Sequence, residues 1–126
     1  MALSDPIGER EEFEVTISVD EIGRRLQVLC SKWGADVDPI NHGGGVLSRF
    51  SDRCDIEVTI SGIARKLTKQ IYMLHFYVLE AGDRRLVRID AVGHSTAAKI
   101  WYGTRDTINM SESIKRQAEI ISVLKQ

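Results

Sequence analysis

The chain has 126 residues, 43% of them hydrophobic and 28% charged, which suits a single globular domain with its own core. A net charge of −1 argues against a general nucleic-acid binder, and no apolar run is long enough to cross a bilayer. Two cysteines, Cys30 and Cys54, are too few to staple a secreted mini-protein and lack zinc-site spacing. We therefore expect a cytoplasmic protein without a metal or cofactor.

The first residues separate into a leader and a strand. Residues 1–11 mix charges with proline and glycine and predict a flexible leader, so the single α+β domain is expected over 12–126. Phe13, Val15 and Ile17 then alternate with polar residues, which is the period of a half-buried strand.

A helix is expected over 19–33. Ser18 is a favourable N-cap, Glu21 three residues later completes a capping box, and Gly34 suits the position after the last turn. Gly23 inside the helix is unfavourable by roughly 1 kcal/mol and is expected to permit close packing on the sheet. The apolar stripe of this helix consists of Ile22, Leu26, Leu29 and Trp33.

The middle of the chain alternates between turns and short strands. Residues 35–45 contain Pro39 and three consecutive glycines and predict a turn-rich connection. Residues 46–50 predict a short strand, and alternation over 56–60 predicts a second strand with one apolar face. A basic, irregular connector is expected over 62–68.

The segment 69–92 predicts two long strands joined by a tight turn at 81–83. In 70–79 both faces are apolar or aromatic, which is typical of a central strand that is covered on both sides. Residues 98–103 are compatible with a strand or with a helical turn. Asn109 or Ser111 then caps a helix of about 111–125. Its expected buried stripe is Ile114, Ala118, Ile121 and Leu124, widened by Ile120 and Val123.

The predicted order is therefore β-α-β-β-β-β-α. Short turns between successive strands predict an antiparallel β-meander, and two amphipathic helices can pack on one of its faces, which gives an α+β fold.

Two segments resemble catalytic motifs. His42, Gly43, Gly44 and Gly45 match the HGGG segment of esterases and the HGG segment of hotdog-fold thioesterases, and Ser95 lies in an elbow-like sequence. In esterases the catalytic histidine follows the serine, whereas every histidine here precedes Ser95. The few residues between Gly45 and the strand expected at 56–60 also leave no room for the central helix of a hotdog fold. We assign no catalytic residue and keep the four loop residues as a candidate loop site.

Basic residues cluster at two connections and form the main candidate site. One group lies in the connector before the long hairpin, and the other lies at and after its turn. If the two groups converge at one end of the sheet, they form a patch for acidic headgroups or an acidic partner. The candidate residues are Arg65, Lys66, Lys69, Arg84, Arg85 and Arg88.

The pattern resembles a known family. The helix EIGRRLQVLCSKWG, the strand DIEVTI and the hairpin FYVLEAGDRRLVRID, in this element order, resemble the kinase-associated domain at the C-terminus of AMP-activated, microtubule-affinity-regulating and checkpoint kinases. The resemblance covers about residues 12–125. It implies a non-catalytic regulatory module that binds anionic phospholipid or docks on a protein partner.

Three functions therefore remain open. The leading one is a non-enzymatic regulatory or binding module that recognises an anionic membrane surface or a protein partner. The second is a small cystatin-like or hotdog-like domain, with a pocket between helix and sheet, that binds a small ligand or hydrolyses an acyl thioester. The third is a dimeric adaptor or chaperone-like protein that associates through an exposed sheet face.

Overall fold

The computed structural model describes residues 6–40, 54–64, 70–94 and 108–126. These residues form a five-stranded antiparallel sheet and two helices, which confirms the α+β class and the element order β-α-β-β-β-β-α. The strands are β1 (Pro6–Val15), β2 (Asp36–Pro39), β3 (Ile56–Ala64), β4 (Gln70–Ala81) and β5 (Arg84–His94), and the helices are α1 (Val19–Trp33) and α3 (Met110–Leu124).

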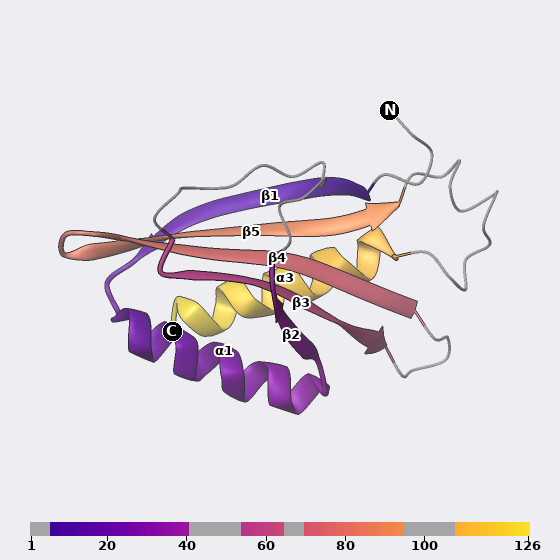
Figure 1. Ribbon diagram of the computed structural model, residues 1–126, viewed down its shortest axis with the longest axis horizontal. Helices are drawn as coiled ribbons and strands as arrows, with labels where there is room; N and C mark the ends of the chain where they lie inside the picture. The colour runs from indigo at the N-terminus through magenta and orange to yellow at the C-terminus, as the bar shows by residue number, and fades with distance from the viewer. Residues whose placement is uncertain (1–5, 41–53, 65–69, 95–107) are drawn as a thin grey trace.

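The strand order is β1-β5-β4-β3-β2, so the long strand β4 lies at the centre, as predicted, and β1 and β2 form the edges. Both helices lie on the same face of the sheet (Figure 1). The core is the layer between them: Ile22 and Leu26 of α1 and Ile120 of α3 meet Phe76 and Ile89 of the central strands, and all five side chains are buried.

The helix α1 has the predicted bounds. The Ser18 hydroxyl accepts a hydrogen bond from the Glu21 amide at 3.1 Å, and Gly34 ends the helix at φ 66°. A full capping box would also have the Ser18 amide donate to the Glu21 carboxylate. That carboxylate instead accepts hydrogen bonds from Arg24 and Arg25, so only half of the capping box is present. A Cβ on Gly23 would meet nothing within 4 Å, so the expectation that this glycine allows close packing on the sheet is wrong.

The edge strands depart from the sequence prediction. Residues 6–11 were expected in a flexible leader, but they belong to β1, in which Pro6 pairs with His94 of β5. An edge strand tolerates charge because much of it faces water, and opposite charges here define the register. Arg10 lies opposite Asp90 and bonds to it at 3.0 Å. The short strand predicted over 46–50 lies outside the described residues, and β2 occupies part of the connection expected to be irregular.

The buried stripe of α3 agrees with the prediction only in part: Ile120 and Leu124 are buried as expected. Ile114 and Ala118 are exposed, and the positions that face the sheet include Ser113 and Gln117. Gln117 Nε2 donates to two strand carbonyls, those of Glu9 at 3.0 Å and Ile89 at 2.7 Å. A polar residue is acceptable at this depth because its hydrogen bonds are satisfied.

An aromatic contact fixes α3 to α1 and to the sheet. The guanidinium of Arg116 lies 4.9 Å from the ring centroid of Trp33 and 4.4 Å from that of Tyr72. Its Nε also donates to Glu112 one helical turn earlier, at 3.1 Å. Trp33 is therefore part of the packing between the elements, as its place in an apolar stripe predicts.

Candidate functional site

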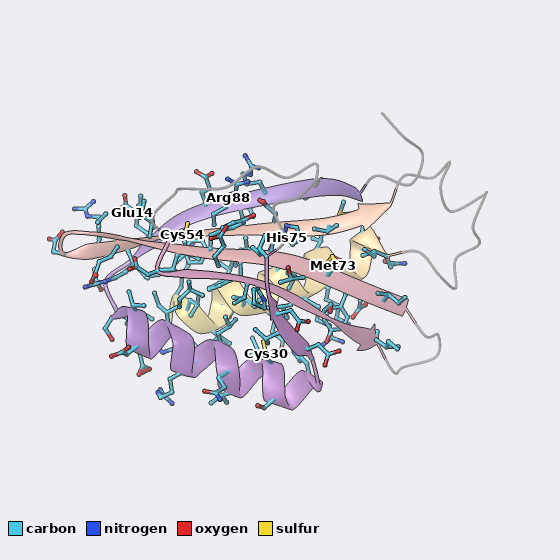
Figure 2. The ribbon with its side chains drawn as sticks, in the orientation of Figure 1. Glu14, Cys30, Cys54, Met73, His75 and Arg88 are labelled. Atoms are coloured by element: carbon cyan, nitrogen blue, oxygen red, sulfur yellow. The ribbon has the colours of Figure 1, made fainter. Side chains whose placement is uncertain are left out.

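Arg88, one of the predicted anion-binding residues, is buried on the sheet face opposite the helices. Its Nε and Nη2 donate to the two carboxylate oxygens of Asp90 at 3.2 and 2.9 Å. Its guanidinium carbon also lies 5.0 Å from the ring centroid of Tyr77. The residue is only 3% exposed, so a solvent-borne anion does not reach it. Figure 2 shows Arg88 and His75 over the strands and Cys30 between α1 and β2.

Arg84 and Arg85 lie at the turn of the β4–β5 hairpin, where the sequence places them, but both have carboxylate partners. Arg84 Nη1 lies 2.9 Å from Glu14, and Arg85 Nη2 lies 2.9 Å from Glu80. These neighbouring carboxylates weaken the positive potential of the turn. The hairpin turn is therefore a mixed-charge surface.

The described residues that flank the two predicted basic groups lie at opposite ends of β4. Arg65, Lys66 and Lys69 lie outside the described residues, but the residues that flank their connector, Ala64 and Gln70, pair at the start of β4. The turn with Arg84 follows Ala81 at the other end of the same 12-residue strand. At about 3.3 Å per residue these ends are roughly 35 Å apart. The candidate loop site His42, Gly43, Gly44 and Gly45 also lies outside the described residues.

The structure instead reveals two grooves, one along each side of α1. The first, which we call the apolar groove, has a volume of about 510 Å³ and lies between α1 and strands β2 and β3. Its lining includes Leu26 and Cys30 from the helix and Val37, Ile56 and Val58 from the strands. This volume is within the usual range of ligand-binding pockets.

Two features shape the chemistry of the apolar groove. Burial raises the pKa of the Cys30 thiol to about 11, so at neutral pH the thiol is protonated and forms a weakly polar part of the groove lining. On the strand side, Val37 of the edge strand β2 is 47% exposed, and all four β2 residues are exposed. The site thus combines an apolar wall with an accessible strand edge.

The second groove, which we call the basic groove, has a volume of about 480 Å³ and lies between α1 and the end of α3. Arg24, Arg25 and Lys32 line it together with Val28 and Val123. The hydrogen bonds from Arg24 and then Arg25 lower the pKa of Glu21 to about 2, so this carboxylate is ionised throughout the physiological range.

The sequence suggested a pocket between helix and sheet as one alternative, but it did not identify the residues that line either groove. The spacing of Arg24, Val28 and Lys32 at every fourth position was visible and places them on one helical face. Nothing in the sequence showed that α3 would lie beside that face. The apolar groove depends on β2, whose four residues Asp36–Pro39 include a proline and resemble a turn.

Among residues 6–40, 54–64, 70–94 and 108–126, no three His, Cys, Asp or Glu side chains are arranged to hold a metal ion. The same part of the chain contains no helix with the length and apolar character needed to cross a membrane. The chain shows no significant match to a protein-family model, to a curated protein or to a solved structure.

Proposed function

We propose that the chain is a non-enzymatic binding module that takes up an extended apolar segment of a partner protein beside β2. The observation that carries the proposal is the position of the apolar groove directly next to an accessible edge strand. We favour a protein partner over a membrane surface, because the described members of the predicted basic patch, Arg84, Arg85 and Arg88, are all paired with carboxylates.

The strand edge supplies the main-chain part of the interaction. β2 pairs with β3 on one side only, and no other strand of the described residues lies along its outer edge. Such an edge presents backbone N–H and C=O groups that an added strand can pair with. Because β2 has four residues and Pro39 lacks an N–H, only a few main-chain bonds are available, and affinity must come largely from side chains.

The groove supplies the side-chain part. Val37 and Pro39 lie opposite Ile60 and Val58 on the helix-facing side of the sheet. Alternate residues of an added strand would point to this same side, toward Leu26 and Cys30 of α1. We therefore expect a preferred partner with apolar residues at every second position.

This proposal matches two earlier expectations in part. A pocket between helix and sheet was the basis of the small-ligand alternative, and a protein-docking module is what the resemblance to the kinase-associated domain implies. That resemblance stays a prediction.

The test is a selection from a random library of peptides of about 12 residues, long enough to form an added strand. Enriched peptides should alternate apolar and polar residues and bind the wild-type protein. Val37→Arg, at an exposed position in the groove, should weaken binding at least roughly tenfold because it places a charge against the apolar segment.

The matched control is Ile63→Arg, which adds the same charge at an exposed β3 position on the opposite face of the sheet. Binding to this variant should equal that of the wild type. A library that yields no enriched sequence, or peptides that bind Val37→Arg as tightly as wild type, would show that the groove is not the docking site.

A further inference from the structure

We infer that the basic groove is a second docking site, which takes an acidic, apolar segment of a partner protein. It lies on the opposite side of α1 from the apolar groove and is lined by different residues. The inference therefore does not depend on the proposed function.

The charge of the groove points to an acidic occupant. Of its three cations, Arg25 is held in place, because it bonds to Glu21 at 2.9 Å and to the Val123 carbonyl oxygen at 3.1 Å. Arg24 donates to both carboxylate oxygens of Glu21, at 2.9 and 2.6 Å, but 65% of its side chain is exposed. Lys32 is exposed, and no carboxylate of the described residues lies within ion-pair distance of it. Lys32 is thus available to receive a carboxylate of a partner, and the exposed Arg24 adds to the positive potential of the groove.

The apolar part of the groove lies between these two cations. Val28 is one helical turn from each and is 60% exposed, the largest exposure of any large hydrophobic side chain in the described residues. A single exposed valine is ordinary on a protein surface. Here it adjoins Leu29 and Val123 in a concave site of about 480 Å³, which a flat, solvated helix face would not provide. An apolar residue flanked by Asp or Glu would complement this arrangement.

A protein segment fits better than an anionic membrane. Polybasic membrane sites generally contain at least about four lysines or arginines on one surface, more than this groove has. The chain as a whole carries a net charge of −1. In addition, the exposed strand β1 carries Glu9, Glu11, Glu12 and Glu14, which a negatively charged bilayer would repel.

The experiment uses a synthetic peptide of glutamate and leucine, of about 15 residues, with leucines at helical spacing. Its lysine and leucine counterpart serves as the charge-inverted probe. Fluorescence anisotropy with the full chain should show binding of the acidic peptide and none of the basic one. The affinity should fall as salt rises from about 50 to about 500 mM, because the groove charges are exposed.

Four variants test whether binding takes place in the groove. Lys32→Glu should weaken binding of the acidic peptide at least roughly tenfold, and Val28→Asp should act in the same direction. Lys115→Glu makes the same charge change at an exposed position of α3 outside the groove and should leave binding unchanged. Val37→Arg, in the apolar groove, should also leave it unchanged, which separates this site from the proposed function.

The inference fails if the acidic peptide does not bind, or if Lys32→Glu and Val28→Asp, shown by circular dichroism to be folded, bind as wild type does. It also fails if vesicles with about 30% phosphatidylserine retain the wild-type protein and release Lys32→Glu, since the groove would then serve a membrane. Concentration-dependent self-association that Lys32→Glu abolishes would equally overturn it.

Discussion

The hydroxyl of Ser113 on α3 donates a 2.7 Å hydrogen bond to the carbonyl oxygen of Val92 on β5. The same hydroxyl oxygen accepts a bond from the Met73 amide of β4 at 3.1 Å. Met73 and Val92 lie opposite each other in the sheet, so one helix side chain bridges two neighbouring strands. Ser113, which is not part of the predicted buried stripe of this helix, thus anchors the helix to the centre of the sheet.

Ser113→Ala should therefore destabilise the fold by about 1–3 kcal/mol, because a buried backbone donor and acceptor lose their partner. The free energy of unfolding from urea denaturation measures the effect. Ser122→Ala, an exposed serine on the same helix, is the matched control and should change stability by less than about 0.5 kcal/mol. Equal stabilities for the two variants would contradict the anchoring role.

Asp90→Ala should destabilise the protein by about 3–5 kcal/mol, because Arg88 would keep a buried charge without its carboxylate. Replacing both partners, Arg88→Met with Asp90→Leu, should recover much of this loss. Arg10 then loses its partner, but its side chain is 44% exposed and water can solvate it. Chemical denaturation of both variants tests this. A double variant no more stable than Asp90→Ala would show that the pair itself stabilises the fold.

Gly93→Ala should be strongly destabilising. A Cβ at this position would lie 2.6 Å from Met110 Cβ and 2.7 Å from Met110 Cα, so the first residue of α3 would have to move away from β5. We expect a loss of about 1–3 kcal/mol, measured by thermal or urea unfolding. A wild-type stability would mean that α3 does not approach the strand so closely.

Gly23→Ala should have the opposite effect and stabilise the protein by about 0.5–1 kcal/mol. The helix gains the more favourable residue, and the added Cβ meets no atom within 4 Å. Unfolding experiments on the two glycine variants in parallel provide an internal comparison. A destabilised Gly23→Ala would indicate that an atom does approach this position.

The Glu21 carboxylate should stabilise the fold at neutral pH and lose this contribution in acid. Its pKa is lowered from 4.5 to about 2 in the folded chain, first by the hydrogen bond from Arg24 and then by that from Arg25. A lowered folded-state pKa means that the contribution is fully present above pH 4.5 and is lost as pH falls toward 2. The stability difference between wild type and Glu21→Gln should therefore shrink across this window.

An NMR titration of the Glu21 side-chain carboxyl provides the direct check. The midpoint should lie near 2 in the wild type and move toward 4.5 when Arg24 and Arg25 are both replaced by glutamine. A wild-type midpoint near 4.5 would show that the two hydrogen bonds do not persist in solution.

The sequence by itself determined the features that depend on neighbouring residues. Ser18 and Gly34 mark the ends of α1 because capping uses groups only a few residues apart. The two-residue turn at Gly82 and Asp83, with φ 68° at Gly82, determines the pairing of β4 with β5. The apolar character of both faces of β4 placed this strand at the centre of the sheet.

Only the tertiary structure decided the rest, because these features depend on residues far apart in the chain. Ser113 and Gln117 are buried because strand carbonyls from β1 and β5 are there to receive their hydrogen bonds. Arg88 is not available to bind an anion, because it pairs with Asp90 on the same face of β5. Strand β1 places Arg10 opposite Asp90, so this carboxylate has two arginine partners. The two grooves exist because α1 packs between the β2–β3 edge and α3, an arrangement that no local periodicity encodes.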